Sequence, residues 1–317
     1  MLAALAAGCS AHAPVTEDRQ HEVLSGSPIE LVDTPFFAQE AYQCGPAALA
    51  TVLQSAGVRV QPEALVPRVY LPRRRGSLQT ELIAATRTYG RLPYVIDPRL
   101  AALVGELEAG HPVLVLQNVG LRIYAVWHYA VVIGYLPSRD ELILRSGRDR
   151  RLSLSTRRFL ESWKPSGYWG LIVLKPGELP ASPDPARYLQ SVAALEEVGR
   201  SDAAQAAYAA AVQRWPDNPT AWFGLGNAYY ATGAPTAAAR AYRQALEVEP
   251  GNAAARNNLA LTLAERGFCT AALSTLRTAL ADEPPESAMH EVLLDTRREI
   301  IERRKPRGEG CRQPARR

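Results

Sequence analysis

A cysteine at the start of an apolar segment is the residue of this chain best suited to chemistry. Cys44 is followed by Gly45 and Pro46 and then by an Ala-, Leu- and Val-rich run with no helix breaker before Gly57. Proline suits the first turn of a helix, because its missing N–H would have no partner there. The pattern predicts a helix over residues 43–56 with Cys44 at its N-terminus, where free N–H groups and the helix dipole favour a thiolate.

A histidine and a glutamine are the candidate partners of Cys44. His128 lies at the start of the segment W-H-Y-A-V-V-I-G-Y over residues 127–135, which predicts a buried β-strand. Gln39 lies five residues before Cys44, where its side-chain amide can donate a hydrogen bond to an oxyanion. Without such partners, Cys44 would be interpreted as a small buried hydrophobic residue. With them, the three groups suit nucleophilic catalysis of acyl transfer.

The sequence resembles the papain-like cysteine peptidases of the bacteriocin-processing, double-glycine-leader family. The resemblance is carried by Q-x-x-x-x-C-G-P-A-A-L over residues 39–49 and by H-Y-A-V-V-I-G-Y from His128, and it extends over about residues 29–177. It implies that Cys44 is the nucleophile, that His128 is the base and acid, and that Gln39 helps to form the oxyanion hole. It also implies an α+β papain-like domain, which agrees with helices that precede the strands.

Two positions depart from the family's pattern. The family's glutamine usually lies six residues before the cysteine, where this chain has Ala38, so that Gln39 is displaced by one residue. The family's aspartate, which follows the next strand and orients the histidine, is replaced by serine. The sequence leaves three candidates for orienting His128, namely Ser146, Asp149 and Asn118.

The first domain is expected over residues 29–177. Its expected helices are 43–56, 62–66, 77–89, 98–109 and 155–163, and its expected strands are 92–96, 113–117, 124–135, 141–145, 151–154 and 168–174. Ser77 is the expected N-cap of the third helix. A proline-rich linker is expected over residues 178–185.

The C-terminal part of the chain repeats with a period of 34 residues. Three residue types recur at this spacing: Gly199, Gly233 and Gly267; Ala204, Ala238 and Ala272; Pro216, Pro250 and Pro284. The middle unit resembles a tetratricopeptide repeat at its signature positions Trp222, Leu225, Gly226, Tyr229, Ala238, Tyr242, Ala245 and Pro250. The sequence therefore predicts an all-α tetratricopeptide repeat solenoid, with three repeats and a capping helix over residues 186–304 and a basic disordered tail over residues 305–317.

Repeat arrays of this kind present a groove that commonly holds a protein segment. Asn227, Asn257 and Asn258 lie on the first helices of their units. Asn227 and Asn258 are candidates for gripping the backbone of a protein partner. They are equally compatible with ordinary solvated polar positions.

The N-terminus carries a second motif. L-A-A-G-C-S over residues 5–10 resembles a bacterial lipoprotein processing site, at which Cys9 would be lipidated. Only eight residues precede Cys9, so the motif requires a start site assigned too far downstream or a truncated chain; an ordinary N-terminal tail is the alternative. With a lipid anchor, residues 1–28 are a signal remnant and tether, and the protein faces the periplasm of a bacterial cell envelope. Cys269 and Cys311 are the two remaining cysteines, and the sequence does not decide whether they form a disulfide.

Composition argues against several other functions. The net charge is only +4, and the short arginine runs 73–75 and 148–151 are not interleaved with aromatic residues, so nucleic-acid binding is not expected. No His, Cys and Asp cluster has metal-ligand spacing, and no cofactor is expected. No run of 18 apolar residues spans a membrane.

The sequence thus predicts a cysteine peptidase whose repeats recruit a protein substrate or partner. One alternative is a catalytically silent papain-like shell that acts as a membrane-anchored binding scaffold. Another is acyl transfer by the same residues to an acceptor other than water.

Overall fold

The structure is a computed structural model that describes residues 26–38, 44–121 and 123–304. Internal contacts divide the chain into two compact units. Of the described residues, the first comprises those up to 55, 59–78 and 95–172. The second comprises residues 56–58, 79–94 and 173–304. None of the described helices is long and apolar enough to cross a lipid bilayer.

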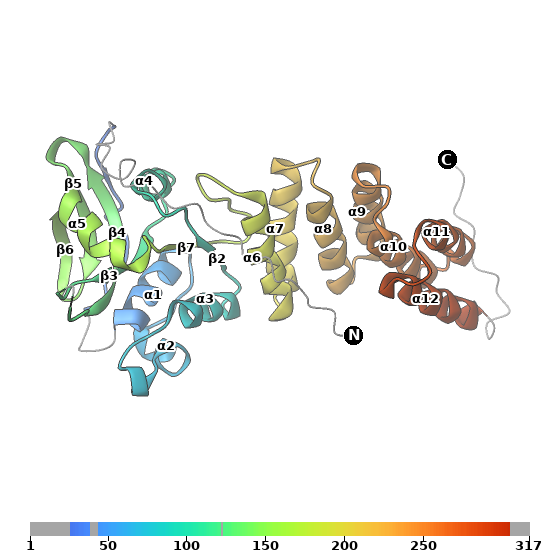
Figure 1. Cartoon of the computed structure of the whole chain (residues 1–317), viewed down its shortest axis with the longest axis horizontal. Coiled ribbons are helices and arrows are strands. Elements are labelled where there is room, and N and C mark those ends of the chain that lie inside the picture. Colours follow the sequence, from blue (N-terminus) through green and yellow to red (C-terminus); the bar gives the residue numbers. More distant parts are fainter. Residues whose placement is uncertain (1–25, 39–43, 122, 305–317) are drawn as a thin grey trace. The chain divides into compact units, whose positions relative to one another are not determined.

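A seven-stranded sheet has the strand order β2-β7-β3-β4-β5-β6, with β1 paired to β4 (Figure 1). The strands are β1 Ile29–Glu30, β2 Leu92–Val95, β3 Val113–Asn118, β4 Trp127–Leu136, β5 Glu141–Ser146, β6 Asp149–Ser155 and β7 Gly170–Leu174. Strand β4 pairs antiparallel with both β3 and β5, and it is buried from Tyr129 to Tyr135. The ten-residue strand that carries His128 is therefore held on both sides.

The helices of residues 44–163 are short. They are α1 Cys44–Ser55, α2 Pro62–Val69, α3 Gln79–Thr88, α4 Leu100–Glu108 and α5 Thr156–Trp163, with 3-10 turns at Pro72–Arg74, Pro137–Arg139 and Lys164–Ser166. Helix α1 begins at Cys44 and is followed by Gly57, whose φ of 79° ends the helical conformation. Nearly all of α1 is buried, and it packs against β3 and β4.

Several element boundaries differ from the sequence-based expectation. Helix α3 begins at Gln79, and the hydroxyl of Ser77 has no hydrogen-bond partner among the described residues, so the prediction that Ser77 is its N-cap is wrong. Strand β4 begins at Trp127 rather than at residue 124, because Tyr124 forms an isolated bridge with Leu121 in the preceding loop. Helix α2 continues through Pro67 to Val69.

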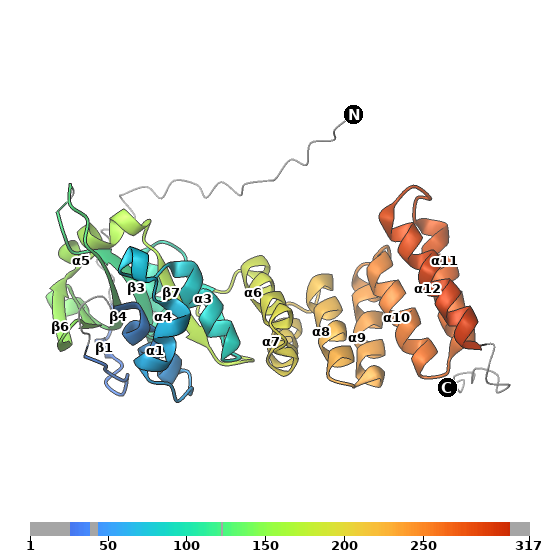
Figure 2. The same cartoon turned by 90° about the horizontal axis from the view of Figure 1, so that it is seen from below.

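The second unit ends in seven helices that lie beside one another in sequence order (Figures 1 and 2). They are α6 Pro185–Glu197, α7 Ser201–Arg214, α8 Pro219–Ala231, α9 Pro235–Val248, α10 Ala253–Glu265, α11 Cys269–Asp282 and α12 Ala288–Arg304. The period of 34 residues governs the local structure as well. Gly199, Gly233 and Gly267 all adopt positive φ, at 72°, 76° and 83°, in the turns within the helix pairs.

The same period recurs in the helix caps. The side chains of Asp184, Asn218 and Asn252 each accept a hydrogen bond from the backbone amide three residues later, and so begin α6, α8 and α10. Sequence analysis identified the repeated glycines and alanines but not these caps. The caps are spaced like the glycines, so each helix pair starts and turns at equivalent residues.

Small residues allow the repeat helices to touch. Ala204, Ala238 and Ala272 are fully buried. A Cβ atom on Gly226 would lie 2.4 Å from the ring of Tyr242, which is itself buried and hydrogen-bonded to Asn227. The tyrosine ring therefore occupies the space that a larger residue on α8 would need.

We expect that Gly226→Val lowers the free energy of unfolding by about 2 kcal/mol, because the Tyr242 ring has no room to move away. Gly251→Val is the matched control, since a Cβ atom there meets no heavy atom within 4 Å. The control should change stability by less than about 0.5 kcal/mol. Chemical unfolding followed by circular dichroism measures both, and equal stability of the two variants would contradict this packing.

Candidate active site

The thiol of Cys44 lies beside the backbone of β4. The backbone amides of Tyr129, Gly45 and Cys44 itself are close enough to the sulfur to favour the thiolate. Burial acts in the opposite direction and is the larger influence, so that the pKa of the Cys44 thiol is raised above its ordinary value. The sequence-based expectation of a lowered pKa at the helix N-terminus is therefore wrong. Cys44 is also a free cysteine, whereas Cys269 is disulfide-bonded.

Gly45 brings the first turn of α1 against the chain that precedes α3. A Cβ atom at Gly45 would lie 2.2 Å from the hydroxyl oxygen of Ser77. The space beside this glycine is thus filled by protein. The hydroxyl of Tyr129 donates to the carbonyl oxygen of Ser77 at 3.2 Å, and the Tyr129 ring packs edge-on against Trp169. These contacts fix the start of α1 against β4.

His128, the second residue of β4, is paired with a serine. Its Nε2 atom lies 3.0 Å from the hydroxyl oxygen of Ser146, the last residue of β5. Of the three candidates for orienting the imidazole, Ser146 is thus the one in contact with it. Asn118 instead accepts hydrogen bonds from the backbone amides of Gly120 and Val126. Asp149 is exposed and lies opposite Ser146 across the β5–β6 turn.

Both candidate catalytic groups favour their neutral forms. Burial lowers the pKa of His128, just as burial raises that of Cys44. Within the described part of the chain, the Nδ1 atom of His128 has no hydrogen-bond partner, and no hydrogen bond joins the imidazole to the Cys44 sulfur. The direction of both pKa shifts favours a thiol and a neutral imidazole, whereas the position of Cys44 at the helix N-terminus alone favours a thiolate.

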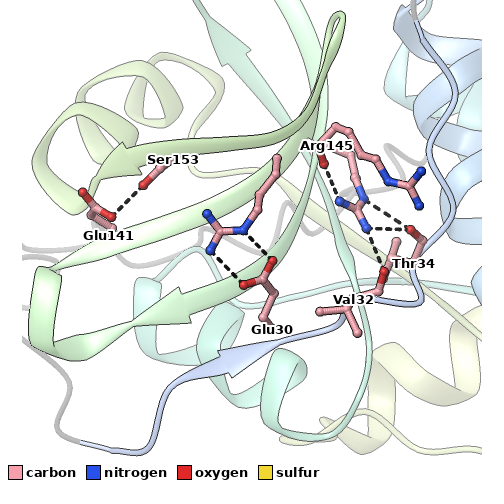
Figure 3. A network of polar contacts seen from close by, with 8 residues as sticks. Glu30, Val32, Thr34, Glu141, Arg145 and Ser153 are labelled. Atoms are coloured by element: carbon pink, nitrogen blue, oxygen red, sulfur yellow. Dashed lines mark hydrogen bonds and ion pairs between the residues drawn. The ribbon is translucent and has the colours of Figure 1, made fainter.

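A buried arginine adjoins this site and was missed by sequence analysis. Arg145 is 5% exposed and precedes Ser146 on β5. Its guanidinium donates to the carbonyl oxygens of Val32 and Thr34, each at 2.9 Å, and also to that of Arg150 (Figure 3). Burial is the main cause of its lowered pKa. The sequence does give an indication of this burial, because Arg145 directly follows the apolar residues 142–144 of β5.

The contacts of Arg145 connect three segments around the site. Val32 and Thr34 belong to the segment that leads from β1 toward Cys44, and Arg150 lies in β6. A separate ion pair holds β1 to β6, because Arg151 pairs with both carboxylate oxygens of Glu30 (Figure 3). Arg145 therefore fixes the strand end that carries Ser146.

Two predicted site residues, Gln39 and Cys9, lie outside the described residues, as does Cys311. Within the described ranges, no group of three or more His, Cys, Asp or Glu side chains is placed to hold a metal ion. The geometry of the site therefore rests on Cys44, His128 and Ser146.

We expect that Arg145→Met lowers the free energy of unfolding by about 3 kcal/mol, because it leaves buried carbonyl oxygens without donors. Arg157→Met is the control, since Arg157 makes only an exposed ion pair with Glu161. That change should cost less than about 1 kcal/mol. Thermal and chemical unfolding measure both, and an Arg145→Met protein as stable as the control would contradict the bridging role.

Comparison with known proteins agrees with this architecture. Residues 31–169 match the model of the Peptidase_C39 like family, and residues 189–241 and 231–294 match two tetratricopeptide repeat models. None of the curated proteins searched matches the chain.

Three solved structures are among those similar to parts of the chain. A C39-like protein from Bacillus anthracis is 16% identical over 47% of this chain and 98% of its own, with a TM-score of 0.41. The peptidase domain of Streptococcus ComA, a bi-functional ABC transporter, is 20% identical over 44% and 98%, with a TM-score of 0.38. The Sgt2 repeat domain from Aspergillus fumigatus is 23% identical over 43% and 89%, with a TM-score of 0.35. From the family models, this chain consists of a C39-peptidase-like α+β domain followed by tetratricopeptide repeats.

Proposed function

We propose that the protein is a cysteine peptidase that hydrolyses peptide bonds with Cys44 and His128. The observation that carries the proposal is the position of the Cys44 thiol beside the Tyr129 amide, one residue from His128. The second support is the contact between His128 Nε2 and Ser146, which leaves Nδ1 as the imidazole atom available to the thiol. The C39-like family match makes peptide hydrolysis the reaction to test first.

The reaction begins from neutral groups. As the substrate carbonyl approaches, Nδ1 of His128 takes the proton of the Cys44 thiol, and the sulfur attacks the carbonyl carbon. The backbone amide of Cys44 and the side-chain amide of Gln39 donate to the oxyanion, each such donor being worth about 3 kcal/mol. The imidazolium then protonates the leaving amine. Water, deprotonated by His128, attacks the thioester and releases the acid and the thiol.

Ser146 supports this reaction only weakly. Its hydroxyl can orient the imidazole, but it carries no negative charge to stabilise the imidazolium that forms in the reaction. The imidazole must also become charged where burial disfavours charge. The same observations favour a second candidate, in which the papain-like shell has lost turnover and serves as a binding scaffold. A cysteine nucleophile tolerates a weak third partner better than a serine does, and for this reason we place the peptidase first.

The repeats are proposed to recruit a protein substrate or another protein partner. A pocket of about 280 Å³ is lined by Asn227, Tyr230, Tyr242, Asn258, Leu261 and Thr262. Asn227 Oδ1 accepts hydrogen bonds from both Tyr242 and Asn258, so these asparagines are ordered rather than merely solvated. The amide nitrogen of Asn227 has no partner among the described residues and is available to a backbone carbonyl of a bound segment. Asn257 is buried and does not line this pocket.

We further propose that the protein is held at a bacterial cell envelope by a lipid on Cys9 and faces the periplasm. The support is the small-residue motif before Cys9 in the sequence. Such an anchor would confine the peptidase to substrates near the membrane.

The peptidase proposal predicts the labelling of the protein by an electrophilic peptide probe, such as a peptidyl vinyl sulfone. Cys44→Ala should abolish labelling, and His128→Ala should slow it by roughly 10²-fold or more, because the base is removed. Ser146→Asp should accelerate it about tenfold, since a carboxylate stabilises the imidazolium, whereas Asp149→Ser, its neighbour in the β5–β6 turn, should have little effect.

The location of the label is read by mass spectrometry of the Cys44 peptide in the intact full-length protein. Equal labelling rates for the parent and for His128→Ala would mean that the thiol reacts without its base. That result would reject the peptidase and favour the silent scaffold.

A further inference from the structure

The loop between β3 and β4 exposes an unusual number of large apolar side chains. We name its described residues, 119–121 and 123–127, the β3–β4 tip. Six of them are exposed: Val119, Leu121, Ile123, Tyr124, Val126 and Trp127. Leu121, Ile123 and Tyr124 are the most prominent, at 69%, 86% and 79% exposed. An apolar cluster of this kind on a folded surface usually marks a site of interaction.

The tip is an ordered hairpin. The amide of Val119 donates to the carbonyl of Val126 at 2.9 Å, and the amide of Tyr124 donates to the carbonyl of Leu121 at 3.0 Å. At its base, the side chain of Asn118 accepts hydrogen bonds from the amides of Gly120 and Val126. The apolar side chains are therefore displayed by a hydrogen-bonded turn, so their exposure is built into the hairpin.

Positive charge lies at the same end of the sheet. The contact between His128 and Ser146 brings the start of β4, which follows the tip, next to the β5–β6 turn. That turn and the start of β6 carry Arg148 and Arg150, both exposed and without a carboxylate partner in the described part of the chain. Asp149 is the one exposed acid between them. One end of the sheet thus combines protruding apolar side chains with free guanidinium groups.

We propose that the β3–β4 tip docks the C39-like domain onto an anionic phospholipid surface. The tip would insert Leu121, Ile123 and Tyr124 among the lipids, with Trp127 at the level of the headgroups, a depth that tryptophan prefers. Arg148 and Arg150 would contact lipid phosphates. Side chains this exposed at the turn of a hairpin suit insertion into a fluid bilayer, whereas a peptide is usually bound in a groove.

This inference is independent of lipidation at Cys9 and of peptidase activity. It places Cys44 and His128 near the membrane surface, because Trp127 is adjacent to His128 in β4. The peptidase would then act on segments that emerge close to the bilayer. The alternative, in which the tip contacts an apolar stretch of the peptide substrate, is separated from it by the experiment.

The test is flotation of the full-length protein, carrying Cys9→Ser so that no lipid is attached, with vesicles of phosphatidylcholine and phosphatidylglycerol. The parent should float with these vesicles. The triple variant Leu121→Ser, Ile123→Ser and Tyr124→Ser should bind at least tenfold more weakly, because it loses the inserted side chains. Arg148→Gln with Arg150→Gln should weaken binding about tenfold, and the loss should vanish for vesicles of phosphatidylcholine alone.

A matched triple variant removes exposed valines from the repeat helices, at Val198, Val248 and Val292, each changed to Ser. It should float like the parent. Thermal unfolding confirms that each variant is folded. A parent protein that does not float, or a tip variant that floats as well as the parent, would overturn the proposal. A tip variant that floats normally but raises KM for a peptide would assign the tip to substrate contact instead.

Discussion

The close approach of the first turn of α1 to β4 is the constraint on which the site depends. Gly45 leaves no room for a side chain against Ser77, and the hydroxyl of Tyr129 is bonded to the Ser77 carbonyl. Together these contacts bring the sulfur of Cys44 to the backbone amide of Tyr129, which is the residue that follows His128. Gly45 in the Cys-Gly-Pro motif is therefore required by packing, whereas Cys44 is required by the proposed chemistry.

This same approach sets the chemistry of the resting site. It adds the backbone amide of Tyr129 to those of Cys44 and Gly45, and all three favour a thiolate, but it also buries the sulfur, and burial is the larger influence on the pKa. The imidazole is buried in the same way and is oriented by the uncharged hydroxyl of Ser146. In a site of this kind, the proton passes from the thiol to the imidazole only as the sulfur attacks the substrate carbonyl.

Much of this could be predicted from the sequence, and the failures have physical reasons. The 34-residue period specified the repeat helices, because its glycines adopt the positive φ of the turns and its alanines are buried between the helices. Ser146 was among the candidates for orienting His128, but choosing it required the register of β4 and β5. Arg145 was missed because its partners are backbone carbonyls more than a hundred residues earlier in the chain. The pKa of Cys44 was predicted with the wrong sign because helix position is visible in a sequence and burial is not.

The most direct test of the central claim is the pH dependence of Cys44 alkylation by iodoacetamide, read from the mass of the Cys44 peptide. Because burial raises the thiol pKa, the thiolate fraction at neutral pH should be lower than that of a free cysteine. The rate should therefore be low near neutral pH and rise at a pH above the ordinary thiol value of about 8.5. A rate that is already at its plateau at about pH 6, as a thiolate–imidazolium pair would give, would contradict the account.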